Sequence, residues 1–302
     1  MLSDFITDTS NFSSIDYKDI LLINGKKYLI SGNAKEERFG IEGPKFWVKR
    51  AVDMDTRDRK IIKLVFFEEF KTELGGLVIR SFRDPDKESS VLELVKGHPN
   101  FMQGISHQDS KGNNVRIIDV IRGRNLYDYI GNLEMKHETY FETIMPNLLK
   151  QLLDAFKAIG FLHQNGLRHG DIRNDHLYME RKTGNFVWID FDYDFEASEN
   201  TYSLDLFGLG NVLLYTIGKG LHLYSMIKSD LKTYGDLVDR ILFQDFSLLD
   251  QSRLLNLKKV FPYIPDSLNN LLMHFSTESE IYYESAEEIV EDLKHCINLL
   301  DK

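Results

Sequence analysis

Three side chains near the middle of the sequence, Asp171, His176 and Asp190, have the types and the spacing of a metal-dependent site. A loop that carries Asp171 and His176 leads into two predicted strands, 177–179 and 186–189, joined by a tight polar turn. Such a pair forms a hairpin, which sets the ends of its strands side by side. Because the second strand ends at Asp190, we expect the three side chains to converge on one small volume, built to hold a divalent metal beside a nucleophile.

The two motifs around these acids resemble the catalytic core of protein kinases, whose pattern is H-R-D-x-x-x-x-N followed by D-F-G. The first reads His169-Gly170-Asp171, with His176 at the position of the Asn, and the second reads Asp190-Phe191-Asp192. The H-G-D and D-F-D forms also look like those of aminoglycoside and choline kinases. Either motif alone occurs by chance, but the two acids 19 positions apart form a strong signal.

The resemblance extends over about residues 27–300 and implies an α+β, bilobal, protein-kinase-like fold. It implies a small antiparallel-sheet N-lobe that binds nucleotide, over residues 26–119, and a mainly helical, catalytic C-lobe, over residues 120–302. Residues 1–25 are rich in Asp, Ser and Thr with little periodicity, and we expect a loosely ordered lead-in there.

Composition is that of an ordinary globular protein, with 302 residues, 42% hydrophobic and 28% charged. A net charge of −10 gives little attraction for phosphate backbones, so nucleic acid is not an expected partner. The single cysteine, Cys296, excludes an internal disulfide and a multi-cysteine zinc site. No secretory signal and no run of about 20 apolar residues is evident, so we expect a cytoplasmic protein with no membrane partner.

In the predicted N-lobe, a strand begins at 27–30, a loop covers 32–44, and further strands follow at 46–53 and 60–67. Lys63 lies inside the last of these apolar strands. A lone lysine there is ordinarily an edge residue that points to water. The resemblance instead makes Lys63 the lysine that pairs with ATP phosphates, because Ile61-Ile62-Lys63 matches the kinase pattern V-A-I-K.

A helix is predicted from Asp84-Pro85, since proline and acids favour a first turn, to 97–100. Its Glu88 is either a solvated helical glutamate or, by the resemblance, the residue that holds Lys63. The strand predicted over 115–121 resembles the fifth strand of the kinase fold, and residues 119–121 at its end resemble the hinge whose backbone pairs with adenine. The resemblance assigns five residues to nucleotide binding: Val48, Ile118, Asp119, Val120 and Ile121.

The predicted C-lobe contains an amphipathic helix over 145–163 and a hydrophobic helix over 203–216. By the resemblance, Asp205 on the second helix caps the backbone of the catalytic loop. Further helices are expected to begin at Pro265 and at the capping box that opens with Ser285.

Phosphoryl transfer needs positioning and charge neutralisation more than covalent chemistry. The resemblance makes Asp171 the residue that orients the attacking hydroxyl and accepts its proton, and Arg173 a cation at the transferring group. Glu88 and Lys63 complete the catalytic set. The cofactors implied are ATP and Mg²⁺ or Mn²⁺, and the metal ligands are Asp190, His176 and Asp192.

Several departures from the kinase pattern bear on activity. His176 replaces a hard amide ligand with imidazole, which prefers softer ions such as Mn²⁺ or Zn²⁺. Gly170 replaces the arginine that reads a phosphorylated loop, which indicates that no such switch operates. Only 15 positions separate Asp190 from Asp205, and no A-P-E triplet is present.

Three hypotheses follow. The first is a kinase that phosphorylates a protein Ser or Thr hydroxyl, its own chain included, with the protein substrate unknown. The second is a small-molecule kinase of the aminoglycoside and choline type, which the H-G-D and D-F-D forms favour. The third is a nucleotide-binding pseudokinase that acts as a switch or scaffold, which His176 and an irregular glycine loop favour.

Overall fold

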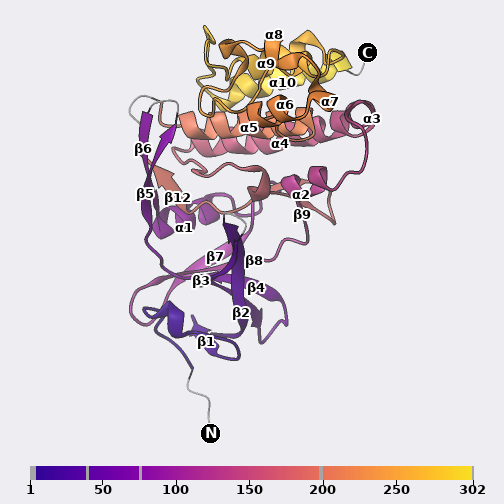
Figure 1. Ribbon diagram of the computed structural model, residues 1–302. Helices are drawn as coiled ribbons and strands as arrows, with labels where there is room; N and C mark the ends of the chain where they lie inside the picture. Colours follow the sequence, from indigo (N-terminus) through magenta and orange to yellow (C-terminus); the bar gives the residue numbers. More distant parts are fainter. Residues whose placement is uncertain (1–4, 39–40, 75–76, 197–199, 301–302) are drawn as a thin grey trace. The chain divides into compact units, whose positions relative to one another are not determined.

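The computed structural model describes residues 5–38, 41–74, 77–196 and 200–300, and its class is α+β (Figure 1). The chain forms two compact units. The first contains residues 1–69 and 82–122, and the second contains residues 70–81 and 123–302. The first unit contains 18 basic residues (Lys and Arg) and 18 acidic residues (Asp and Glu), so its net charge is zero. The net charge of −10 therefore lies in the second unit.

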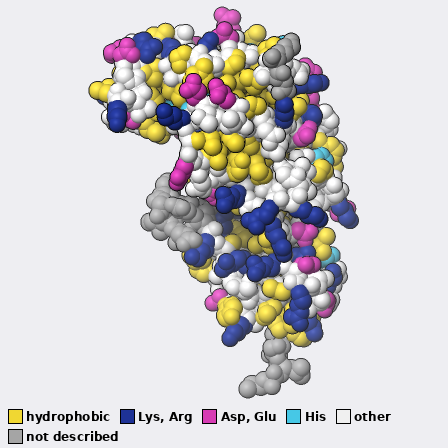
Figure 2. Space-filling model, turned by 90° about the vertical axis from the view of Figure 1, so that its right-hand side faces the viewer, with side chains coloured by type: hydrophobic (Ala, Val, Ile, Leu, Met, Phe, Trp, Pro, Cys, Tyr) yellow, Lys and Arg dark blue, Asp and Glu magenta, His cyan; other side chains and the backbone are white. Residues whose placement is uncertain are grey.

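In its described part, the first unit contains a curled six-stranded antiparallel sheet and one α-helix, α1 (Pro85–Leu94). The strand order is β1-β2-β3-β4-β8-β7. The bounds are β1 Ile20–Ile23, β2 Lys26–Arg38, β3 Ile41–Asp53, β4 Arg59–Lys63, β7 Gly104–Gln108 and β8 Asn114–Asp119. Figure 2 shows several Lys and Arg side chains on the surface of this unit.

The expectation of a loosely ordered lead-in is wrong for the described part of residues 1–25. Ile15 and Leu21 are buried in the core against the sheet. Lys49 of β3 is fully buried, and its ammonium donates to the carbonyl of Ile15 at 2.6 Å and to Oδ1 of Asn33 at 2.8 Å. Buried apolar contacts and a buried lysine therefore hold the segment, which its polar composition concealed.

The prediction of a loop over 32–44 is also wrong. Strands β2 and β3 pair from Tyr28↔Asp53 to Arg38↔Ile41, with register shifts near Gly32. Paired strands therefore occupy the described part of that stretch, and residues 39–40 lie outside the described residues.

The second unit is mainly helical. Helices α4 (Met145–Gln164) and α5 (Ser203–Gly218) lie side by side, with α9 (Asp266–Met273) and α10 (Ala286–Leu300) packed on them (Figure 1). The remaining helices are α2 Leu126–Gly131, α3 His137–Thr143, α6 Tyr224–Ser229, α7 Leu231–Tyr234 and α8 Leu237–Arg240. Within the described ranges no helix is both long and apolar enough to cross a bilayer.

Two small sheets complete the second unit. One has the order β11-β10-β9, with β9 Gly123–Asn125, β10 Leu177–Glu180 and β11 Phe186–Trp188. Its hairpin β10–β11 pairs Leu177 with Trp188, which confirms the predicted hairpin. The other has the order β12-β6-β5, with β5 Glu69–Leu74, β6 Leu77–Arg83 and β12 Tyr193–Phe195, and was not predicted.

Candidate functional site

Lys63 and Glu88 form a buried ion pair in the first unit. Nζ of Lys63 lies 2.6 Å from Oε1 of Glu88, and the two side chains are 5% and 0% exposed. The other carboxylate oxygen, Oε2, accepts from Nε of Arg116 at 3.1 Å. One carboxylate on α1 therefore bridges cations on β4 and β8.

Helix α1 presents Glu88 because of how it begins. Asp84 caps it by accepting hydrogen bonds from the backbone N–H groups of Asp86 and Lys87, and Pro85 occupies its first position. Val91 and Leu92 lie buried one turn further on, so Glu88 lies on the core-facing side. Its position is that of a fixed, buried carboxylate and not of a solvated one.

Sheet register places two of the predicted nucleotide-binding residues, Val48 and Ile118, on the same face as Lys63. Val48 is directly opposite Lys63, and Lys63 is opposite Arg116. Ile118 lies two residues beyond Arg116 and shares that face, because side chains alternate along a strand. Asp119 ends β8 and forms an ion pair with Lys60 at 2.5 Å. The last two predicted residues, Val120 and Ile121, follow the strand end and are exposed and half-buried.

In the second unit, Asp205 of α5 holds the loop that carries Asp171. Its carboxylate accepts from the backbone N–H of His169 at 2.7 Å and of Gly170 at 2.8 Å, and lies 3.0 Å from Nε2 of His163. Gly170 has a φ of +86°, a left-handed conformation that glycine adopts without strain. This confirms the contact between Asp205 and the loop backbone that the resemblance implied.

The side chains of Asp171, His176 and Asp190 lie close together, as expected from the predicted hairpin. His176 lies 3.4 Å from Oδ2 of Asp171 through Nδ1, and 3.7 Å from Oδ2 of Asp190 through Nε2. Nδ1 also lies 2.9 Å from the backbone carbonyl of Asp171. A carbonyl only accepts, so Nδ1 carries a proton, and Nε2 is the ring nitrogen that faces Asp190.

Burial and neighbouring charges set the acidity of the loop. Burial raises the pKa of Asp171, although the charges of His176 and Arg173 oppose the shift. Burial also acts to raise the pKa of Asp175, but hydrogen bonds from Arg173 outweigh it, and that pKa lies below its usual value. Arg173 is half exposed, 2.6 Å from Asp175 and 4.0 Å from Asp171.

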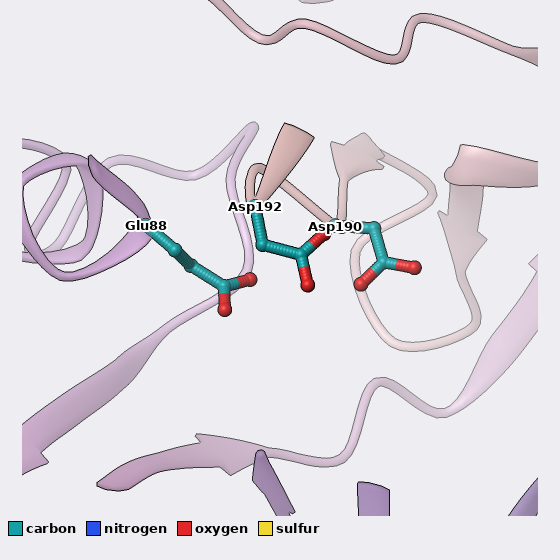
Figure 3. Close-up of side chains that lie close together, drawn as sticks. All are labelled: Glu88, Asp190 and Asp192. Carbon is teal, nitrogen blue, oxygen red and sulfur yellow. The ribbon is translucent and has the colours of Figure 1, made fainter. Parts of the chain in front are cut away.

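Asp190 and Asp192 lie on the short segment that follows β11, and Figure 3 shows their carboxylates side by side. An oxygen of each lies within 4.8 Å of the other. Asp190 has a φ of +66°, which turns the backbone sharply at the strand end. Figure 3 also shows Glu88 projecting from α1 of the first unit.

The pair of His176 and Asp190 has a spacing that fits one divalent ion, whereas no distance is established between His176 and Asp192. Ligand atoms lie about 2.0–2.2 Å from such an ion, so two atoms on the same ion are separated by at most about 4.4 Å. The 3.7 Å between Nε2 of His176 and Oδ2 of Asp190 meets this limit. A mixed imidazole and carboxylate set suits Mn²⁺ and Zn²⁺ better than Mg²⁺.

Arg168 organises the segment that follows these acids. Its guanidinium forms an ion pair with Asp194, donates to the carbonyls of Phe195 at 2.5 Å and Thr201 at 2.8 Å, and lies 4.0 Å from the ring centroid of Phe195. The fork geometry of arginine makes several such bonds at once. Arg168 therefore holds residues 194 and 195 in place through contacts within the chain.

Replacing Arg168 by Met should speed amide hydrogen exchange of residues 193–196 by about 10- to 100-fold, because hydrogen bonds to charged groups contribute about 1.5–3 kcal/mol. Exchange followed by mass spectrometry checks this. Arg181→Met, which removes an exposed arginine of the same unit, is the control and should change nothing there. Unaltered exchange in the Arg168 variant would show that the segment does not depend on the guanidinium.

Sequence reasoning missed Arg116 and Arg168. Arg116 stands in the apolar run Val-Arg-Ile-Ile, the same signal of a lone cation in a strand that drew attention to Lys63. Arg168 directly precedes His169, and nothing in its local pattern distinguishes it from a surface arginine.

The fold and these motif residues resemble those of the protein-kinase-like superfamily. Curated relatives agree. The phosphorylase b kinase gamma catalytic chain, liver/testis isoform, of Mus musculus is 26% identical over 134 residues, 44% of this chain and 31% of that protein. Calcium/calmodulin-dependent protein kinase type 1 of Caenorhabditis briggsae is 29% identical over 122 residues, 37% and 32% of the two chains.

EKC/KEOPS complex subunit bud32 of Dictyostelium discoideum is 26% identical over 122 residues, 39% of this chain and 46% of that protein. The chain thus spans about a third to a half of the length of these relatives. No protein-family model matches the sequence.

Proposed function

We propose that the protein is an ATP-dependent phosphotransferase that transfers the γ-phosphate to a Ser or Thr hydroxyl of a protein, with its own chain as one candidate acceptor. The observation that carries the proposal is the convergence of Asp171, His176 and Asp190, with the backbone that precedes Asp171 held by Asp205. The similarity to protein kinases supports the same reaction class. We further propose a cytoplasmic location.

In this proposal each residue has one task. Asp171 orients the acceptor hydroxyl and takes its proton, and Arg173 places a positive charge near it. Lys63, fixed by Glu88, neutralises phosphate oxygens. The nucleotide base contacts the face and strand end made by Val48, Ile118, Asp119, Val120 and Ile121. Asp190, His176 and Asp192 would hold a divalent ion, which when bound supplies positive charge to the phosphates.

The direct test is incubation of the purified chain with labelled ATP and either Mg²⁺ or Mn²⁺. Incorporation of phosphate into protein supports the proposal. Incorporation into a free aminoglycoside, choline or a sugar alcohol would point to the small-molecule kinase. A stabilising thermal shift with ATP and no turnover with any metal would point to the pseudokinase, because a bound ligand stabilises the folded state without chemistry.

The position of His176 predicts an unusual metal preference. Replacing His176 by Asn should weaken Mn²⁺ binding relative to Mg²⁺ by on the order of 10-fold, the scale of effects around metal ligands, because an amide oxygen replaces a softer imidazole nitrogen. Calorimetric titration of each ion checks this without turnover. His295→Asn on the exposed side of α10 is the control, and equal ratios in all three proteins would contradict the assignment.

A further inference from the structure

Arg50 of β3 points to the face of the first unit's sheet that carries the predicted nucleotide-binding residues. Its neighbour Ala51 belongs to the core cluster that contains the lead-in residue Ile15, on the other face of the sheet. Side chains alternate along a strand, so Arg50 points away from that cluster. Arg50 is exposed, whereas Val48, two residues before it on the same face, is buried. The sheet therefore presents a charged group to solvent on this face.

The sheet register fixes where Arg50 lies along this face. Arg50 is opposite Ile61 of β4, and Ile61 is opposite Ile118 of β8, so the three side chains form one row. The row of Lys63 lies two residues further along the strands, a distance of about 7 Å. In the other direction, Asp119 ends β8 one residue after Ile118. In the proposed function the phosphates lie at Lys63 and the base at the end of β8, so Arg50 faces the base and not the phosphates.

Gly32 of β2 makes room for the guanidinium of Arg50. It is the register partner of Arg50 on the side away from β4. A Cβ atom at position 32 would lie 3.3 Å from Nη2 of Arg50, so the guanidinium lies beside the space of the missing side chain. The φ of +132° at Gly32 is a conformation that favours glycine. The head group of Arg50 therefore extends toward β2, away from Lys63 on β4.

The chemistry of this head group suits a nucleobase. No residue in the described part of the chain forms a hydrogen bond or an ion pair with the guanidinium of Arg50. Arg116 on the same face, by contrast, is 1% exposed and is paired with Glu88. A free, planar guanidinium stacks on the face of an aromatic ring, and a nucleobase presents such a face. Ile61 in the same row supplies a half-buried apolar neighbour for that base.

We infer that Arg50 is a specificity-determining residue that stacks its guanidinium on the base of the bound nucleotide. Such a contact rests on the proposed function, because that function places a nucleotide on this face. A purine offers a larger ring face than a pyrimidine and gains more from stacking. Arg50 therefore favours purine over pyrimidine nucleoside triphosphates.

The test is calorimetric titration of the full-length wild type and of Arg50→Met with ATP, adenosine and inorganic tripolyphosphate, each in the presence of Mn²⁺. In the variant the dissociation constants of ATP and adenosine should both rise about 5- to 20-fold, the scale of a cation–π contact, because the lost contact is to the base. That of tripolyphosphate should change less than about 2-fold, because the phosphates lie in another row. Arg57→Met, which removes an exposed arginine between β3 and β4, is the matched control and should bind all three as the wild type does.

Two further measurements test the stacking itself. Arg50→Lys keeps the charge without the plane, and its affinity for ATP should lie between those of the wild type and Arg50→Met. The ratio of ATP affinity to CTP affinity should fall by about 3-fold or more in Arg50→Met, because the purine loses more. Wild-type affinity in Arg50→Lys, or an unchanged ratio in Arg50→Met, would overturn the inference.

The first titration has its own contrary results. Unchanged ATP affinity in Arg50→Met would show that the guanidinium makes no contact with the nucleotide. A loss for tripolyphosphate and none for adenosine would place Arg50 at the phosphates, and would also overturn the inference. Nucleotide binding without phosphate transfer would remove the proposed function and leave the comparison of affinities intact, because titration requires no turnover.

Discussion

Replacing Asp171 by Asn should lower the initial rate of phosphate incorporation from labelled ATP by about 10²- to 10⁴-fold, the usual contribution of a general base. Asn keeps the shape of the side chain but cannot accept the hydroxyl proton. The loop should remain in place, since Asp205 holds it through the backbone N–H groups of His169 and Gly170. Rates measured with Mg²⁺ and with Mn²⁺ check the prediction.

Two controls make the result specific. Asp154→Asn, on the exposed side of α4, should leave the rate within experimental error. The Asp171 variant should keep the thermal shift that ATP gives the wild type, because the lost step is transfer and not binding. Incorporation at the wild-type rate in the Asp171 variant would remove this residue from the mechanism.

Replacing Asp205 by Ala should lower the free energy of unfolding by roughly 3–5 kcal/mol, the range for breaking a buried charged network. The carboxylate is fully buried, and its loss leaves the N–H groups of His169 and Gly170 without their acceptor. Urea denaturation at pH 7 measures the change. Asp239→Ala, at an exposed position of α8, should stay within about 0.5 kcal/mol.

The same pair of proteins gives a pH test. Burial acts to raise the pKa of Asp205, but hydrogen bonds from His163 and Gly170 prevail, and the folded pKa lies below 3.8. A depressed folded pKa stabilises the protein above the unfolded value and loses that contribution as pH falls through the folded value. The stability difference between wild type and Asp205→Ala should therefore be full at pH 7 and shrink below pH 3.8. A difference below about 1 kcal/mol at pH 7 would contradict this account.

Local signals in the sequence predicted the elements that carry the motif residues. Asp84-Pro85 marks the start of α1, and the polar turn between two short apolar runs marks the hairpin β10–β11. These patterns depend on neighbours within a few residues, where backbone preferences and periodicity act. The contact of Asp171, His176 and Asp190 followed from the hairpin alone.

Features that depend on distant partners were not predictable in this way. The order of the lead-in comes from burial of Ile15 and Leu21 against the sheet. The role of Arg116 depends on a register that places it opposite Lys63, and a one-residue slip would move it to the other face. The pairing of β6 with β12 joins segments about 115 positions apart, which no local pattern encodes.

The hairpin β5–β6 changes how the molecule can be divided. The chain leaves the first unit after Glu69, returns at Phe82 and leaves again after Arg122. Strand β6, which lies between these two points of the chain, pairs with β12. Next to this pair the N–H of Glu196 donates to the carbonyl of Arg80 at 2.9 Å. If residues 1–122 and 123–302 were expressed as separate fragments, β6 would belong to the first fragment. Strand β12 of the second fragment would then lack its hydrogen-bonding partner. Reassembly of the second unit would then require that the two fragments recombine.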